Sequence, residues 1–144
     1  MPRISQKATL MPSSPIRKLV PYAEDAKKRG IHVHHLNIGQ PDIKTPQQAL
    51  KAVKEADFSV LAYNRTEGSE AFRTKIAGYY NALNLNVSAE DIVVTTGGSE
   101  ALSFALGSVL DPGEELIVPE PFYANYNGFA QANNVTIVPI TCDF

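Results

Sequence analysis

The residues best suited to chemistry in this sequence form a short polar turn, TTGGSE, at positions 95–100. A β-branched apolar run precedes the turn, and an apolar-periodic segment follows it directly, which predicts a strand, a glycine turn and a helix N-terminus. Unpaired backbone N–H groups and the positive end of the helix dipole meet at such a junction, so it suits an anion, most often a phosphate. Gly97 and Gly98 allow a ligand close to the backbone, and Ser99 adds a hydroxyl donor. The alternative is that Ser99 is an ordinary N-cap and the glycines are only turn residues.

Two other kinds of site are not supported. No lysine follows the glycines at the spacing of a P-loop, and the G-x-G-x-x-G spacing of dinucleotide-binding proteins is absent. His32 and His34 would lie on one face of a short strand, so a metal pair is conceivable. Because no third ligand has suitable spacing, we expect ordinary surface or packed histidines and no metal.

The elements that position this turn alternate between helices and strands. Prolines interrupt residues 1–15 and predict an extended arm, Ser14-Pro15 predicts the start of a helix that Gly30 ends, and Thr45-Pro46 predicts the start of another. The predicted helices cover about 16–29, 46–56, 69–84 and 99–110, with one more ending near 133; the predicted strands are 31–38, 92–96, 116–119 and 135–140. In the helix that starts at Ser69, we expect Phe72, Ile76 and Tyr79 or Tyr80 to be buried.

This alternation predicts an α/β fold with a parallel sheet, in which ligands bind at the carboxyl ends of strands. Ser99 and Tyr123 both follow predicted strands. The 144 residues suffice for one domain, and a net charge of −2 argues against nucleic acid or an anionic membrane as partner. No apolar run reaches the roughly 18 residues of a transmembrane helix. The lone Cys142 excludes an internal disulfide and fits a reducing compartment, so we expect a cytoplasmic protein.

Four motifs occur together and in one order: IGQPD at 38–42, Tyr63 with Gly68, TTGGSEAL at 95–102, and PEPFYANY at 119–126. Through them the chain, from about residue 13 on, resembles the N-terminal third of class I/II aminotransferases, which are pyridoxal 5'-phosphate enzymes of fold type I. The resemblance implies an N-terminal arm and small-domain segment over 1–45. It implies that 46–144 form the first part of the cofactor-binding large domain, with an incomplete, mainly parallel sheet.

The resemblance also assigns cofactor-binding roles. Gly98, Ser99 and Glu100 match the turn that holds the cofactor phosphate, mainly through backbone N–H groups, so the Glu100 carboxylate should point away from the phosphate. Tyr123 matches the aromatic residue that stacks on the pyridine ring, a task that suits a flat aromatic side chain at a strand exit. The alternative for Tyr123 is a packed core aromatic with a satisfied hydroxyl.

The resemblance assigns two further residues, one to the neighbouring subunit's cofactor and one to the substrate. Tyr63 matches a tyrosine that reaches the phosphate of the neighbouring subunit, so the resemblance implies a homodimer; alternatively Tyr63 is a packed core aromatic. Gly39 matches the backbone position that contacts the substrate's α-carboxylate. The implied partners are therefore an amino acid and a 2-oxo acid.

The catalytic residues of the family are not found in this sequence. The lysine that forms a Schiff base with the cofactor, the acid paired with the pyridinium nitrogen and the arginine for the substrate carboxylate all lie beyond the position that matches Phe144. We therefore expect an N-terminal fragment, inactive alone, of an enzyme that transfers an amino group. Alternatives are another fold type I enzyme, such as a carbon–sulfur lyase, or a non-catalytic phosphate-ligand binding domain. The amino-acid substrate is not specified.

The resemblance makes one prediction about strand pairing that departs from the usual pairing of sequential strands. Residues 116–119 should pair in parallel with 135–140, and 92–96 should form no ladder with either. The helix after the turn would then leave apolar side chains uncovered. These are Leu102, Phe104, Leu106 and Val109.

Overall fold

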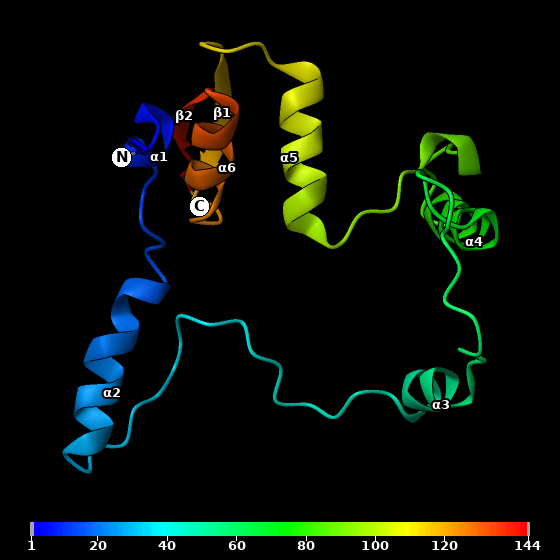
Figure 1. Cartoon of the computed structure of the whole chain (residues 1–144), viewed down its shortest axis with the longest axis horizontal. Coiled ribbons are helices and arrows are strands. Elements are labelled where there is room, and N and C mark those ends of the chain that lie inside the picture. Colours follow the sequence, from blue (N-terminus) through cyan, green and yellow to red (C-terminus); the bar gives the residue numbers. More distant parts are fainter. Residues whose placement is uncertain (1, 144) are drawn as a thin grey trace. The chain divides into compact units, whose positions relative to one another are not determined.

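The computed structural model describes residues 2–143, which form helices and one small parallel sheet (Figure 1). The α-helices are α1 (Gln6–Leu10), α2 (Val20–Lys28), α3 (Gln47–Glu55), α4 (Glu70–Asn81), α5 (Gly98–Val109) and α6 (Tyr126–Asn133). The strands are β1 (Glu115–Glu120) and β2 (Thr136–Thr141), and two 3-10 turns are η1 (Arg17–Leu19) and η2 (Ala89–Asp91). The chain divides into two compact units: unit 1 holds the residues up to 37 and from 96 on, and unit 2 holds 38–95.

The sheet of unit 1 confirms the predicted pairing. β1 and β2 are parallel, in a register that runs from Glu115 opposite Thr136 to Glu120 opposite Thr141. Helix α6 connects them and ends at Asn134, whose left-handed backbone (φ +57°) suits asparagine. Among the described residues, 92–96 form no ladder with either strand. The expectation that 92–96 form a strand is wrong, because an extended segment becomes a strand only when a neighbour pairs with it along its length.

The core of unit 1 is small and apolar. Leu106 of α5, Val118 of β1, Ala130 of α6 and Val135 are buried. Burial of Leu106 (8% exposed) contradicts the expectation that it would be uncovered, because α6 packs against α5. Phe104 and Val109 are exposed as predicted, and Leu102 is half-buried.

The N-terminal arm was predicted to be extended, but it contains the helix α1. Ser5 caps α1 by accepting the Ala8 N–H at 3.1 Å, and α1 packs on α6. The Lys7 ammonium donates to the Ala132 carbonyl at 2.9 Å, so a cation meets the carbonyls at the C-terminal end of α6. The arm therefore contains a helix whose docking site lies far along the sequence.

The segment after the arm follows its local signals in part. The Ser14 hydroxyl accepts the Arg17 N–H at 3.4 Å where the helix was predicted to begin, but the first turn there is the 3-10 turn η1, and α2 begins only at Val20. At the other end of α2, Gly30 has φ +78° and the Ile31 N–H bonds to the Ala26 carbonyl, which is a Schellman ending. The strand expected over 31–38 does not form, because no neighbouring strand pairs with it.

Unit 2 contains α3 and α4. Pro46 is the N-cap of α3, one residue later than predicted, and α3 has no buried residue. Ser69 is the N-cap of α4 as predicted, but the buried residues of α4 are Arg73 and Ala77. The face expected to be buried is not: Phe72, Tyr79 and Tyr80 are exposed, and Ile76 is half-buried. The reason is that the segment packed on α4 is η2, which contacts a different face of the helix.

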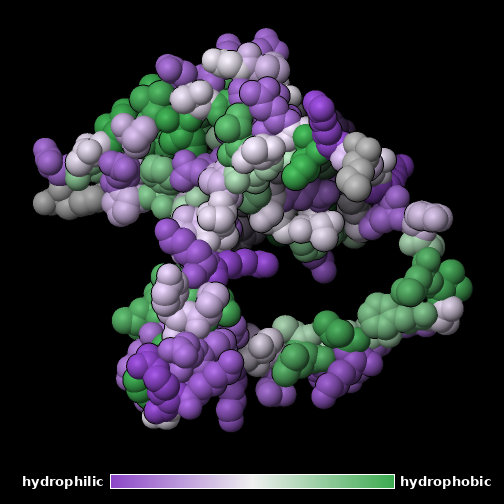
Figure 2. Space-filling model, turned by 60° about the vertical axis from the view of Figure 1, so that its left-hand side comes forward, coloured by the Kyte–Doolittle hydropathy of each residue, from purple (hydrophilic) through white to green (hydrophobic). Residues whose placement is uncertain are grey.

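Apolar side chains reach the surface at several places in both units (Figure 2). Within residues 2–143, no helix is both long and apolar enough to cross a bilayer. The boundary at residue 45 between small-domain segment and large domain stays a prediction.

Candidate functional site

The turn before α5 has the geometry of an anion site. Gly97 is the N-cap and has φ +94°, a backbone conformation that favours glycine. The first hydrogen bond of the helix runs from the Ala101 N–H to the Gly97 carbonyl at 3.3 Å. The amides of Gly98, Ser99 and Glu100 come before that bond, in the first turn of the helix. Backbone N–H groups in a first turn have no helical carbonyl four residues earlier to which they could donate.

The space at the turn is open. Ser99 is exposed in the first turn of α5, as predicted, and a Cβ built at Gly98 would meet no atom within 4 Å. The Glu100 carboxylate bends back and accepts the Thr96 N–H at 2.6 Å, which fixes the residue before the N-cap. This resembles a capping box, in which an acidic side chain at the third helical position bonds a backbone N–H ahead of the helix. The role of the Glu100 amide stays a prediction.

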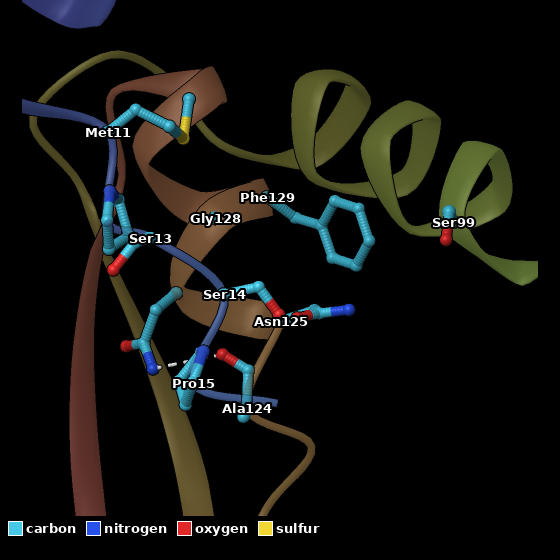
Figure 3. A pocket seen from close by; sticks show the side chains of 11 residues that line it. Met11, Ser13, Ser14, Pro15, Ser99, Ala124, Asn125, Gly128 and Phe129 are labelled. Atoms are coloured by element: carbon cyan, nitrogen blue, oxygen red, sulfur yellow. Dashed lines mark hydrogen bonds between the residues drawn. The ribbon is translucent and has the colours of Figure 1, made fainter. Parts of the chain in front are cut away.

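Ser99 also lines a pocket of about 430 Å³ within unit 1. Figure 3 shows the three segments that form it: the arm around Ser14, the start of α5 at Ser99, and the beginning of α6 with Asn125 and Phe129. The ring of Phe129 extends from α6 toward α5. The lining thus combines hydroxyl and amide groups with one aromatic face, which suits an organic molecule that carries a few polar groups.

Tyr123 lies just beyond the carboxyl end of β1, as predicted. Its side chain is 48% exposed, and the next residue, Ala124, lines the pocket. The Asn125 amide donates to the Tyr123 hydroxyl at 2.6 Å, and Tyr126 meets the Tyr123 ring edge to face at 5.7 Å. The ring is therefore oriented by two neighbours while part of its surface stays open, which a stacking platform requires.

The other two predicted site residues belong to unit 2. Tyr63 is fully exposed, and a Cβ at Gly39 would meet no atom within 4 Å. Exposure of Tyr63 argues against the alternative of a packed core aromatic within this chain. Gly98, Ser99, Glu100 and Tyr123 thus all belong to unit 1, and the predicted roles of the six residues stay predictions.

Sequence reasoning missed the arm and α6 as part of the pocket wall. The prolines in positions 11–15 predicted an extended path but carried no information about the surface on which it lies. Phe129 gave only the signal of an apolar residue in a helix.

A metal site at the histidines has no support in the structure. The ring centroids of His32 and His34 lie 4.4 Å apart, but residues 2–143 contain no group of three side chains that could hold a metal ion.

Comparison with known proteins gives consistent matches. Residues 31–144 match the family model described as aminotransferase class I and II. The chain is 29% identical, over 98% of its length, to (5-formylfuran-3-yl)methyl phosphate transaminase of Methanocaldococcus jannaschii and covers 38% of that protein. It is 36% identical, over 85% of its length, to a probable N-acetyl-LL-diaminopimelate aminotransferase of Bacillus subtilis and covers 31% of that protein.

Solved structures agree with these relatives. Alanine aminotransferase from Pyrococcus furiosus matches with a TM-score of 0.84 and 31% identity over 96% of this chain and 36% of that one. Aspartate aminotransferase from Thermotoga maritima matches with a TM-score of 0.84 and 28% identity over 96% of this chain and 37% of that one. The chain therefore spans little more than a third of the length of these structures, and its α/β fold is that of the corresponding part of fold type I aminotransferases. The chain belongs to the aminotransferase class I and II family.

Proposed function

We propose that this chain supplies the phosphate-binding turn and the ring-stacking residue of a pyridoxal 5'-phosphate-dependent aminotransferase. The reaction is transfer of an amino group between an amino acid and a 2-oxo acid. The observation that carries the proposal is the open turn at Gly98–Glu100, with three first-turn amides at the start of a twelve-residue helix. Names of related proteins support transamination over a carbon–sulfur lyase or a non-catalytic binding domain.

The residues of the turn fit a phosphate group. The amides of Gly98, Ser99 and Glu100 would donate to its oxygens, and the helix dipole favours its negative charge. The missing Cβ at Gly98 leaves room for the group. When bound, the cofactor supplies an electron sink for the carbanion that forms at the amino acid's α-carbon.

The remaining residues orient the cofactor and the substrate. Tyr123 would stack on the pyridine ring, since two neighbours fix its ring and leave it partly open. Gly39 would donate its N–H to the substrate α-carboxylate, and Tyr63 would reach the phosphate of a second subunit, so we propose a homodimer. A cytoplasmic location is proposed from the single Cys142.

The experiment follows backbone amide shifts of the chain by NMR during titration with inorganic phosphate. We expect the amides of Gly98, Ser99 and Glu100 to shift together, and we expect Ser99→Ala to weaken the binding. Ser108→Ala, at the other end of the same helix, is the matched control. Phosphate that shifts none of the three amides in the wild-type chain would contradict the proposal.

A second titration uses pyridoxine 5'-phosphate, which lacks the aldehyde and so cannot react with lysines. Tyr123→Ala should weaken its binding by about 1–3 kcal/mol while leaving the affinity for inorganic phosphate unchanged. Tyr79→Ala, which removes an exposed tyrosine from α4, should change neither. Equal affinities of Tyr123→Ala and the wild type for pyridoxine phosphate would show that Tyr123 only packs.

A further inference from the structure

Three aromatic side chains lie together within unit 1, where β1 ends and α6 begins: Phe122, Tyr123 and Tyr126. We infer that Tyr126 is a positioning residue for the cofactor, because its ring sets the plane of the Tyr123 ring while Phe122 holds Tyr126 in turn. This inference rests on the proposed stacking role of Tyr123. It extends that role to two aromatic residues that are not proposed to touch the cofactor.

The backbone brings Tyr123 and Tyr126 close to each other. The Tyr126 N–H donates to the Tyr123 carbonyl at 2.9 Å, which closes a turn directly after the strand exit. Tyr126 is the first residue of α6, and the Gly128 N–H donates to the carbonyl of the N-cap Asn125 at 3.0 Å. The start of the helix therefore fixes the turn that holds the two tyrosines.

One bond fixes the tip of the Tyr123 side chain but not the plane of its ring. The Asn125 amide donates to the Tyr123 hydroxyl at 2.6 Å. The hydroxyl oxygen lies on the axis about which the ring rotates, so a bond at this atom permits that rotation. The ring torsion of tyrosine has only broad preferences of its own. A second contact, made by the ring itself, has to set the plane.

Tyr126 makes that second contact. Its ring plane is perpendicular to that of Tyr123, with the ring centroids 5.7 Å apart, which is a favourable edge-to-face pair. Rotation of the Tyr123 ring would lose this geometry. Phe122 stacks on Tyr126 with centroids 6.1 Å apart and planes 6° from parallel, so Tyr126 has a support of its own. Phe122 and Tyr126 are half-buried, whereas Tyr123 is exposed, so Tyr123 is the ring that a ligand can reach.

A fixed plane matters for a ligand that stacks. A ring that rotates freely must be ordered when a flat ligand binds on its face, and this ordering lowers the affinity. The Tyr126 contact orders the Tyr123 ring before the ligand arrives. Inorganic phosphate has no ring to stack, so its affinity should not depend on Tyr126.

The test measures the affinities of the chain for pyridoxine 5'-phosphate and for inorganic phosphate by NMR titration. For Tyr126→Leu we expect pyridoxine phosphate to bind about threefold to tenfold more weakly, the worth of one aromatic pair. Phosphate affinity should change less than about twofold. Tyr126→Phe keeps the ring and should restore the affinity for pyridoxine phosphate. Phe122→Leu should weaken the binding in the same direction but by a smaller factor.

The chain offers a matched control in unit 2. Tyr79 and Tyr80 of α4 form a similar edge-to-face pair, with centroids 5.5 Å apart and planes at 67°. Tyr79→Leu breaks that pair as Tyr126→Leu breaks the other, and it should change either affinity by less than about twofold.

Two further readouts separate positioning from packing and from direct contact. The ring current of Tyr123 should shift the methyl protons of bound pyridoxine phosphate, and this shift should be smaller in Tyr126→Leu. In a chain that already carries Tyr123→Ala, adding Tyr126→Leu should cause no further loss, because a positioning residue acts through the residue that it positions. A further loss would show that Tyr126 contacts the ligand itself and would overturn the inference.

The outcomes distinguish this inference from the proposed function. If pyridoxine phosphate does not bind the wild-type chain, or binds Tyr123→Ala equally well, the proposed stacking role is wrong and the inference falls with it. If Tyr123→Ala weakens the binding and Tyr126→Leu does not, the inference alone is overturned. Equal losses in Tyr126→Leu and Tyr126→Phe, or parallel losses for both ligands, overturn it as well. If Tyr126→Leu removes the protection of the β2 amides, Phe122→Leu decides by the same comparison of ligands.

Discussion

The two units of the molecule are held together by different interactions. Among the described residues of unit 1, the buried side chains are all apolar: Leu106, Val118, Ala130 and Val135. The buried side chains of unit 2 are Arg73 and Ala77, and the arginine binds backbone carbonyls. Unit 1 is thus stabilised mainly by removing apolar area from water, and unit 2 mainly by directed hydrogen bonds. Because unit 2 depends on directed hydrogen bonds, we expect its stability to be more sensitive to changes in backbone geometry than the stability of unit 1.

Two helices of similar length illustrate the same difference. Helix α6 has eight residues and buries Ala130, whereas α3 has nine and buries none, with Leu50 and Val53 exposed. Both have the alternation of apolar and polar residues typical of a helix with one buried face. An amphipathic pattern therefore predicts which face would be buried, but burial itself depends on a second element that packs there.

The largest expected effect comes from a cavity in the core of unit 1. Leu106→Ala should lower the free energy of unfolding of unit 1 by about 3 kcal/mol, because a buried leucine loses its packing partners. Phe104→Ala on the same helix should cost less than about 1 kcal/mol, since Phe104 is 56% exposed. Hydrogen exchange of amides in β1 and β2 measures the effect on unit 1 alone. Similar losses for the two variants would argue against an apolar core centred on Leu106.

A glycine pair tests the geometric sensitivity of unit 2. Gly68 and Gly113 have nearly the same φ, +95° and +96°, but a Cβ would meet Val94 only at Gly68. Gly68→Ala should therefore destabilise unit 2 by about 2 kcal/mol, from left-handed strain plus overpacking. Gly113→Ala should destabilise unit 1 by about 1 kcal/mol from strain alone. Exchange of the Val94 amide and of the β2 amides gives the two values, and a larger cost at Gly113 would contradict this account.

A smaller effect is expected at the start of α5. Glu100→Ala removes the carboxylate that accepts the Thr96 N–H, so α5 should lose about 0.5–1 kcal/mol. Glu100→Gln, which keeps an acceptor at the same place, should lose less. Helix stability is read from exchange of the Ala101 amide. Equal exchange in wild type and Glu100→Ala would show that the bond to Thr96 contributes nothing.

The smallest effect concerns pH in unit 2. The Asp91 carboxylate accepts the N–H and the hydroxyl of Ser88, both at 2.8 Å, and these bonds lower the pKa of Asp91 below its usual value of 3.8. Because the folded-state pKa is the lower one, the stabilisation is fully present above about pH 4 and is lost as the pH falls through the lowered pKa. The Ser88 amide shift should follow this titration, and Asp91→Asn should abolish it.

Local signals predicted much of the fold. The start of α4, the ends of α2 and α6, and the β1–α6–β2 order were confirmed because a cap, a glycine or an asparagine acts within a few residues. The strands expected at 31–38 and 92–96 were wrong because strand formation depends on a neighbour, which sequence does not identify. The same reason explains the exposed Phe72 and the buried Leu106.

For the candidate site, too, local residues predicted one part and gave no signal for another. The turn at 95–100 was predicted from its own residues, and the structure shows the helix start and the open space. In unit 2, the burial of Arg73 was not predicted, because arginine is rarely buried and its acceptors are carbonyls 5 and 16 positions away, which no sequence pattern marks. The specific roles of Tyr63 and Gly39 came from family resemblance and remain to be tested.

The docking of α1 on α6 has a consequence for the order of folding. Paired residues of β1 and β2 are 21 positions apart, whereas Lys7 and the Ala132 carbonyl that it binds are 125 apart. Contacts between distant residues carry the larger loop-closure cost and form later. We therefore expect pulse-labelled hydrogen exchange to protect β1 and β2 before the amides of α1; simultaneous protection would contradict this order. During synthesis the arm is made before α6, so it can dock only after α6 has emerged from the ribosome.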